Sequence, residues 1–389
     1  MSLLPKLHPR ALAAPESGIV AVINYARGHE GLIPLWAGEG DLPTPDFIGR
    51  AAARSLAEGE TFYTWQRGIP ELRRALAGYT ARLYGTAPDP ERFFVTGSGM
   101  HAIQLAMTAL AGPGEEAIFT GPLWPNFSAA AALAGAQPVE VLLESRDGGW
   151  HLDPARLEAA VTPRTKAIFV NTPNNPTGWT ADHATLRAML DIARRHGLTI
   201  VADEIYSRFF YEGGRAPSFH DVMEEGDAVV FVNSFSKNWA MTGWRMGWIE
   251  APAEMGAVIE NLVQYSNSGV PAFLQKGAVA ALEEGEDFVA SQIERAHKAR
   301  DLFCDALLAT NRVEMAKPAG AFYAFFAVDG MQDTRAAAFR IADEAGVGLA
   351  PGTAFGSGCG RFLRACFHRR LDEVEEAGAR LAGWIGRQA

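Results

Sequence analysis

The sequence predicts an α/β protein with a mostly parallel central sheet flanked by helices, followed by a smaller α+β domain. Three observations support this fold class. From about residue 90, short β-branched or aromatic segments alternate with longer helical patterns, which is typical of a parallel sheet. Several of the short segments are apolar throughout, as strands buried on both faces are. After about residue 250, long helical patterns precede one strand-like segment, Ala321–Val328, and a Gly-rich loop.

The expected strands of the central sheet share this apolar, β-branched character. They are Phe93–Thr96, Ala117–Thr120, Val139–Leu143, Ala167–Asn171, Thr199–Ala202, Val229–Val232 and Met246–Ile249. Between two of them, Ala181–His196 carries apolar residues on one helical face, with Thr180 as the expected cap and Gly197 as the end. The Ala-rich segment Ser128–Ala136 is expected to form a tightly packed helix.

Composition places the chain among ordinary globular proteins. It has 389 residues, of which 48% are hydrophobic and 21% charged, and at roughly 150 residues per domain this length predicts two or three domains. The 35 basic and 45 acidic residues give a formal net charge of −10, which disfavours nucleic acid and anionic membranes as partners.

The distribution of cysteines and apolar residues predicts a cytoplasmic location. The three cysteines form no CxxC pair, which fits a reducing compartment. No apolar run approaches the roughly 18 residues of a spanning helix. Prolines interrupt the basic N-terminal segment where a signal peptide has its apolar core, so we expect no export signal.

The loop after the first expected strand, Val95–Ala102, opens a helix. Its glycines reproduce the G-x-G-x-x-A pattern of dinucleotide sites, but an ordinary strand-to-helix turn explains that pattern equally well. We infer only that the backbone N–H groups of Ser98, Gly99 and Met100 are free to bind a phosphate.

A lysine with apolar neighbours follows the strand that ends near residue 232. Burial of Lys237 should disfavour its ammonium form and lower its pKa, as a Schiff-base lysine requires. Ser234, Ser236 and Arg245 lie close in the sequence, so two hydroxyls and a guanidinium can share one phosphate beside it. The alternative is a surface lysine, with Arg245 in a salt bridge. Three tryptophans within sixteen residues favour the buried site.

A carboxylate ends the next buried strand along the predicted sheet. Asp203 follows the apolar segment LTIVA and therefore needs a cationic partner. That partner is either a buried arginine or the protonated nitrogen of a pyridine ring, as in pyridoxal phosphate enzymes. Tyr206, three residues later, is placed to donate to an oxygen of such a ring.

Two further polar residues stand in unusual settings. Asn175 lies between prolines in NTPNNPTG, a rigid and polar connection that aims its amide at a ligand, with a cofactor oxygen as candidate. Arg364 lies in the otherwise apolar segment FLRACF, where a buried guanidinium is suited to binding a carboxylate. Arg361, at the edge of the preceding loop, is expected to be solvated.

In their order along the chain, these motifs resemble the class I and II aminotransferases, fold-type I pyridoxal 5′-phosphate enzymes related to aspartate aminotransferase. The motifs are GEGD with TP (Gly38–Asp41 and Thr44–Pro45), YTWQRGIPELR (Tyr63–Arg73), the Ser98–Gly99 loop, GPLWPNF (Gly121–Phe127), NNPTG, ADEIY, SFSK with MTGWR, GAFY (Gly320–Tyr323) and the Arg364 segment. They span nearly the whole chain. The resemblance implies a large cofactor-binding domain at 47–290 and a small domain made from 1–46 and 291–389.

The resemblance implies pyridoxal 5′-phosphate as cofactor, with Lys237, Asp203 and Tyr206 as catalytic residues. Lys237 matches the lysine that forms a Schiff base with the cofactor and then moves the α-proton. Asp203 matches the acid that keeps the pyridine nitrogen protonated. Asn175 and Tyr206 match the donors to the phenolic oxygen of the ring, and Trp124 matches the aromatic residue that stacks on it.

The resemblance also implies where the phosphate and the substrate bind. The expected phosphate ligands are Ser98, Gly99, Met100, Ser234, Ser236 and Arg245. Tyr63 is expected to reach the phosphate of the neighbouring subunit in a homodimer. Gly38, Asn175 and Arg364 are expected to bind the substrate, an amino acid whose amino group passes to a 2-oxo acid by a ping-pong mechanism, and no metal site is expected.

The sequence leaves three alternatives open. A nicotinamide dehydrogenase would explain the glycine pattern after the first strand but gives Lys237, Asp203 and Asn175 no role. A carbon–sulfur β-elimination or a decarboxylation would use the same cofactor residues. A non-enzymatic regulator on this fold is disfavoured by the negative charge. No motif identifies the substrate side chain or an oligomer beyond a dimer.

Overall fold

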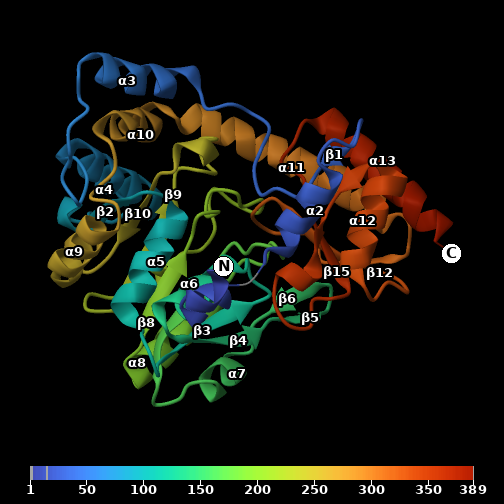
Figure 1. Cartoon of the computed structure of the whole chain (residues 1–389), viewed down its shortest axis with the longest axis horizontal. Coiled ribbons are helices and arrows are strands. Elements are labelled where there is room, and N and C mark those ends of the chain that lie inside the picture. The colour runs from blue at the N-terminus through green and yellow to red at the C-terminus, as the bar shows by residue number, and fades with distance from the viewer. Residues whose placement is uncertain (1–2, 15, 389) are drawn as a thin grey trace.

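A seven-stranded sheet forms the centre of the computed structural model, which describes residues 3–14 and 16–388 (Figure 1). The strand order is β2-β10-β9-β8-β7-β3-β4. The strands from β9 to β4 are parallel, and β10 runs antiparallel to both of its neighbours, so the predicted mostly parallel sheet is confirmed. The strands are β2 (Phe93–Thr96), β3 (Glu116–Gly121), β4 (Gln137–Leu142), β7 (Thr165–Asn171), β8 (Thr199–Asp203), β9 (Val229–Ser234) and β10 (Gly247–Glu250).

Successive residues of the central strands point into different cores, which explains why these strands are apolar throughout. In β8, Val201 belongs to a cluster with residues of α5 and α6, whereas Ile200 packs on the opposite face with residues of α8. A third cluster joins β2 to α3, α4 and α10. The helices around the sheet are α3 (Asp46–Ala57), α4 (Pro70–Tyr84), α5 (Gly99–Leu110), α6 (Asn126–Ala134), α7 (Pro154–Ala159), α8 (His183–His196), α9 (Gly256–Ser266) and α10 (Ala272–Glu284).

The smaller part of the molecule is a four-stranded antiparallel sheet, with order β11-β12-β15-β14, packed against long helices. Its strands are β11 (Val313–Met315), β12 (Tyr323–Val328), β14 (Ala350–Pro351) and β15 (Phe362–Cys366). Its helices are α11 (Glu286–Leu308), α12 (Thr334–Ala345) and α13 (Leu371–Arg387). Two peripheral elements, the hairpin β5 (Glu144–Arg146) with β6 (Gly149–His151) and the short helix α1 (Pro9–Leu12), lie outside both sheets.

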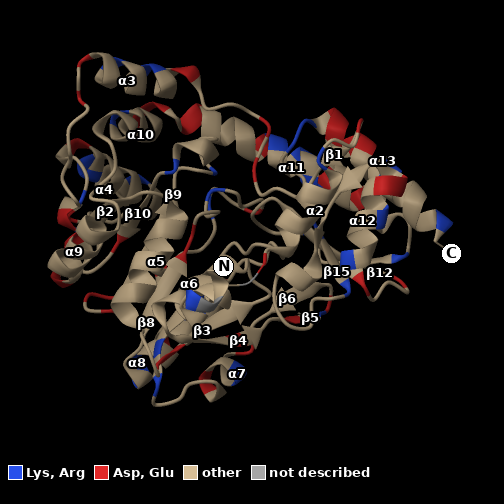
Figure 2. Ribbon diagram, viewed as in Figure 1, with Lys and Arg blue, Asp and Glu red and all other residues tan. Residues whose placement is uncertain are grey.

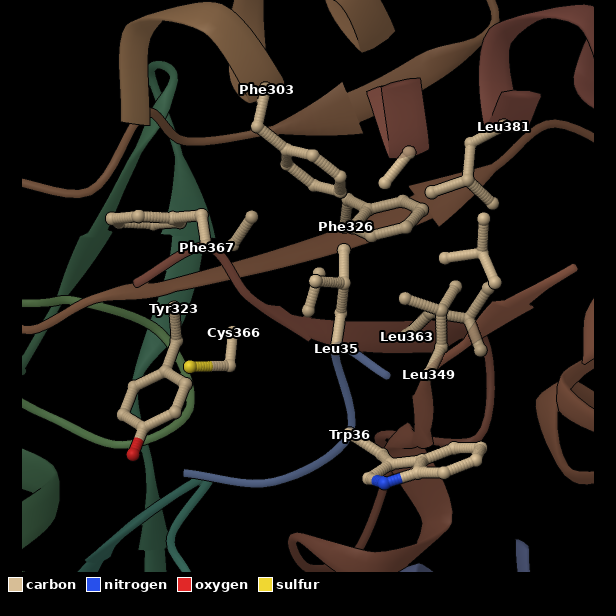
Figure 3. Packing of buried hydrophobic residues seen from close by; sticks show 14 of the residues in the cluster. Leu35, Trp36, Phe303, Tyr323, Phe326, Leu349, Leu363, Cys366, Phe367 and Leu381 are labelled. Carbon is tan, nitrogen blue, oxygen red and sulfur yellow. The ribbon is translucent and has the colours of Figure 1, made fainter. Parts of the chain in front are cut away.

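The N-terminal segment joins this smaller part. Strand β1 (Ile33–Pro34) pairs in parallel with β13 (Val347–Gly348), and α2 (Gly18–Ala26) contacts α12. Leu35 packs in one core with Phe303 and Leu363 (Figure 3). The expected α+β part built from both chain ends is therefore confirmed. The boundaries at residues 46 and 290 stay a prediction, and α11 runs through the second of them.

The structure corrects several predicted element ends. Helix α8 begins at His183, not Ala181, because the Asp182 side chain, and not Thr180, accepts the cap hydrogen bond, from the Thr185 N–H at 2.7 Å. Helix α6 lies two residues earlier than predicted and ends at Ala134, and the residue that caps it, Gly135, has a φ of 100° that favours glycine. Strand β12 begins only at Tyr323, because the backbone before it turns through a positive φ at Ala321.

Charged residues lie mainly on the outer helices and loops, and the central strands carry few of them (Figure 2). Cys304, Cys359 and Cys366 are buried free thiols. Among residues 3–14 and 16–388, no helix has both the length and the apolar character needed to cross a bilayer.

Candidate functional site

A cavity of about 460 Å³ lies where the carboxyl ends of the parallel strands meet the smaller part of the molecule. Asn171 ends β7, Asp203 ends β8 and Ser234 ends β9, so the sheet brings all three to one edge. Most of the predicted site residues line this cavity: Gly38, Gly99, Met100, Trp124, Asn175, Asp203, Tyr206, Ser234, Ser236, Lys237, Arg245 and Arg364. The exceptions are Ser98 and Tyr63.

Lys237 lies in the turn after β9, half-buried and facing the cavity. Its Nζ donates a hydrogen bond to the Gly38 carbonyl oxygen at 2.6 Å. Burial lowers the pKa of Lys237 to about 8, against the charge of nearby Glu39, and the positive charges of Arg364 and Arg245 lower it further. The surface-lysine alternative is therefore wrong, and the ammonium gives up its proton close to neutral pH.

Asp203 is a buried carboxylate without a cation to neutralise it directly. Its side chain is 8% exposed and accepts one hydrogen bond, at 3.3 Å from the Ile205 N–H. Within the described part of the chain, no arginine, lysine or histidine forms an ion pair with it, so the predicted alternative of a buried arginine partner is wrong. Burial raises the pKa of Asp203 to about 7, and the distant charge of Lys237 offsets this only in part.

The unpaired carboxylate of Asp203 should make the stability of the cofactor-free protein depend on pH. Between the ordinary Asp pKa of 3.8 and about 7, the folded state holds a proton that the unfolded chain has lost. The free energy of unfolding should therefore fall as pH rises through this window, by on the order of 3 kcal/mol, and Asp203→Asn should remove that fall. Urea unfolding at pH 5 and pH 7.5 measures this, and an Asp203→Asn effect equal at both pH values would contradict it.

Arg364, on β15, is a second buried charge without a counterion. It is 2% exposed, and its Nη1 donates to Asn175 Oδ1 at 3.0 Å while its Nη2 donates to the Trp36 carbonyl oxygen. Its Nε has no hydrogen-bond partner in residues 3–14 and 16–388, and no carboxylate there pairs with it. The guanidinium lies over the rings of Tyr323 and Phe355, at 4.7 and 4.9 Å. A buried cation with an unused donor is suited to binding an anion.

Two tyrosines, Tyr206 and Tyr323, line the same cavity as Asp203 and Arg364. The hydroxyls of Tyr206 and Tyr323 lie 2.7 Å apart, and burial raises the pKa of both, so both stay protonated near neutral pH. A Cβ at Gly38 would lie 2.5 Å from the Tyr323 hydroxyl, which explains why glycine stands there. Figure 3 shows Tyr323 directed away from the apolar core that packs around Leu363.

Gly99 and Met100, in the first turn of α5, line the cavity, and the N–H groups of a first helical turn have no acceptor within the helix. The Ser98 hydroxyl caps this helix by accepting from the His101 N–H at 2.9 Å, and its expected role toward a phosphate stays a prediction. A Cβ at Gly247 would lie 2.6 Å from the Gly99 nitrogen, so only glycine lets β10 support this turn. Opposite, the Ser234 and Ser236 hydroxyls lie 2.8 Å apart.

Tyr63 lies outside the cavity of its own chain. It is 95% exposed, next to the exposed side chains of Phe62 and Trp65, and lines a separate hollow of about 440 Å³ with Asn267–Phe273. The structure therefore does not bring Tyr63 together with Lys237.

Sequence reasoning missed several residues that line or shape the cavity. Tyr323 lies within a quoted motif but received no role, and Asn171, whose Oδ1 accepts from the Asn175 N–H at 2.8 Å, ends an apolar strand like any turn residue. Ile19 and Val20 of α2 and also Trp36 line the cavity, and no local pattern distinguishes them from core residues.

Known proteins share this fold. The family model for aminotransferase class I and II matches residues 30–381. An aspartate/prephenate aminotransferase from Thermus thermophilus is 34% identical over 390 residues, covering 97% of this chain and 99% of that protein. The solved aspartate aminotransferase from Thermus thermophilus with maleate has a TM-score of 0.90 at 34% identity, over 97% of this chain and 99% of that chain.

A second solved structure extends this similarity to a different named activity. An alanine aminotransferase from Pyrococcus furiosus has a TM-score of 0.92 at 29% identity, over 98% of this chain and 100% of that chain. The family model covers most of the chain, and the relatives match it from end to end. The chain therefore belongs to the class I and II aminotransferases and is an enzyme that transfers amino groups.

Proposed function

We propose that the chain catalyses pyridoxal 5′-phosphate-dependent transamination between an amino acid and a 2-oxo acid in this cavity. The observation that carries the proposal is the placement of two buried, unpaired charges, Asp203 and Arg364, in one cavity with Lys237. Each charge is costly without a ligand, and the two have opposite signs. A ligand pair with a protonated ring nitrogen and a carboxylate relieves both.

The residues present fit the cofactor. Asp203 would hold the pyridine nitrogen, since its raised pKa reflects a missing cation that a protonated ring supplies. Tyr206 and the amide nitrogen of Asn175 would donate to the phenolic oxygen, and Trp124 would cover the ring face. The phosphate would lie against the N–H groups that open α5 and the side chains of Ser234, Ser236 and Arg245.

When bound, pyridoxal phosphate supplies an electron sink that stabilises negative charge at the substrate α-carbon. Arg364 binds and orients the substrate carboxylate, and Asn175 fixes the guanidinium through their hydrogen bond. Lys237 Nζ would hold the cofactor at its aldehyde and would serve as the base for the α-proton, which its pKa of about 8 permits at neutral pH. An oxo acid leaves before the second oxo acid enters, so the kinetics are ping-pong.

The test is a half-reaction without any oxo acid. The holoenzyme mixed with an amino acid should release the matching oxo acid and leave pyridoxamine phosphate in equal amount, as measured by absorbance and chromatography. Release of pyruvate and ammonia from cysteine conjugates would instead indicate β-elimination, and release of carbon dioxide would indicate decarboxylation. Family membership already rules out the nicotinamide dehydrogenase alternative.

We also propose a homodimer in which Tyr63 reaches the phosphate of the neighbouring subunit. Three neighbouring aromatic side chains, Phe62, Tyr63 and Trp65, are exposed, which is unusual for a surface that no other chain covers.

The three buried, unpaired thiols support a reducing compartment, and we propose the cytoplasm.

Tyr63→Phe should weaken binding of pyridoxal phosphate about tenfold or more, because it removes one hydrogen bond to a charged group. Equilibrium dialysis measures the affinity, and sedimentation confirms that the variant keeps the mass of the dimer. Tyr265→Phe, another exposed tyrosine, is the matched control and should bind the cofactor normally. A monomeric wild-type protein, or a Tyr63→Phe variant with unchanged affinity, would contradict the proposal.

A further inference from the structure

One wall of the cavity has no role in the proposed chemistry. Helix α2 begins at the mouth of the cavity, where Ile19 and Val20 are lining residues. A Cβ at Gly18 would lie 3.8 Å from the Pro351 side chain, so the start of α2 packs directly on β14. Strand β14 pairs with β15, where Ala350 lies opposite Arg364. The start of α2 therefore lies beside the strand pair that carries Arg364.

A second apolar group approaches Arg364 from the large sheet. The Leu123 N–H donates to the Phe355 carbonyl oxygen at 2.8 Å, and the ring of Phe355 lies 4.9 Å from the Arg364 guanidinium. Ile19 packs against the cluster that contains Phe355. Ile19, Val20 and Leu123 line the same cavity as Arg364 and come from segments that pack beside it. We call these three residues the apolar wall.

The positively charged residues that line the cavity limit which substrate side chains it can bind. Among the residues the structure describes, the lysines and arginines that line it are Lys237, Arg245 and Arg364, and the proposed function uses each of them. A second carboxylate on the substrate would face the apolar wall without a cation from this chain. Burying an unpaired carboxylate is strongly unfavourable, whereas an alkyl or aryl side chain gains from the same surface.

We infer that the preferred amino donor is a monocarboxylic amino acid with an uncharged, apolar side chain about the size of leucine, methionine or phenylalanine. Its side chain contacts the apolar wall, and aspartate and glutamate are poor donors. The inference rests on the proposed function, because it takes Arg364 as the site of the α-carboxylate.

The first test compares donors in the half-reaction of the wild-type holoenzyme. The kcat/KM for leucine should exceed that for alanine roughly tenfold or more, because added methylenes contact the wall, and should exceed that for aspartate by at least about 100-fold. Aspartate reacting as well as leucine would overturn the inference and leave the proposed function intact. Failure of every donor to yield pyridoxamine phosphate would overturn the proposed function instead.

A binding measurement with unreactive acids compares the two kinds of side chain without the transamination reaction. The unreactive acid 4-methylpentanoate has the carboxylate and side chain of leucine, and succinate adds a second carboxylate in place of the apolar end. Calorimetry on the holoenzyme should show 4-methylpentanoate bound at least about tenfold more tightly than succinate. Tighter binding of succinate would show that a cation, including one from a partner subunit, meets the distal carboxylate, and would overturn the inference.

A variant tests the position of the wall. Val20 is 49% exposed, so Val20→Lys should fold and place an ammonium at the rim of the cavity. We expect the aspartate-to-leucine ratio of kcat/KM to rise about tenfold or more. Val258→Lys, on α9 outside the cavity and 52% exposed, is the charge-matched control and should leave the ratio unchanged. An equal ratio in both variants would show that α2 does not contact the substrate side chain; if Val20→Lys fails to fold, the wild-type measurements decide.

Discussion

Lys237→Ala should lose amino transfer by at least about 10³-fold, since the substitution removes both the group that binds the cofactor aldehyde and the base for the α-proton. Lys237 donates a hydrogen bond to the Gly38 carbonyl oxygen, and the loss of this one bond should leave the fold intact. The variant should still bind pyridoxal phosphate, but without the absorbance band of the lysine-bound form.

Borohydride reduction followed by peptide mapping locates the attachment in the wild-type protein. The labelled peptide should contain Lys237, and Lys237→Ala should yield none. Lys298→Ala, an exposed lysine on α11, is the matched control and should retain full activity and labelling. A Lys237→Ala protein that transaminates at the wild-type rate would refute the assignment.

The second large effect is expected at Arg364. Arg364→Gln keeps a donor near Asn175 but removes the positive charge, and kcat/KM for the amino acid should fall roughly 10²- to 10³-fold. The loss should appear mainly in KM, because the guanidinium contacts the substrate carboxylate before and during reaction. Binding of pyridoxal phosphate, followed by its absorbance, should be unchanged.

Arg361→Gln is the control for this experiment. Arg361 lies three residues before Arg364 in the same segment but pairs with Glu314 at the surface, at 2.6 Å. Its substitution should change kcat/KM less than about twofold, as expected for an exposed ion pair. A similar loss in both variants would show that the effect at Arg364 is structural.

Much of the fold was predictable because the central strands are buried on both faces. A strand such as β8, whose neighbouring residues enter different cores, must be apolar at every position, and this is visible in the sequence. The reversed direction of β10 was not predictable, since its apolar residues carry no sign of orientation. The predicted start of α8 was wrong because Asp182 and Thr180 are both acceptable capping residues. Only the tertiary structure decides between them.

The candidate site was predictable where a charged residue interrupts an apolar context. Lys237, Asp203 and Arg364 each follow or interrupt a buried strand, and such a charge needs a ligand or partner. Residues that shape the cavity without charge gave no comparable signal. Ile19 and Val20 look like the apolar face of any helix, and Gly247 is needed because the backbones of Asn233 and Gly99 both pack closely on it. Their roles depend on contacts between segments far apart in the sequence.

The hydrogen bond from Arg364 to the Trp36 carbonyl oxygen has a consequence for biosynthesis. It joins residues 328 positions apart, and Leu35 accepts from the Cys366 N–H in the same region. Loop closure over such a separation is slow and comes late, after more local contacts have formed. The large sheet can assemble while the ribosome is still translating, but the carboxylate site exists only once β15 has emerged and the segment Leu35–Trp36 has docked against it. The carboxylate site therefore forms only after almost the whole chain has been translated, because its two halves lie near opposite ends of the chain.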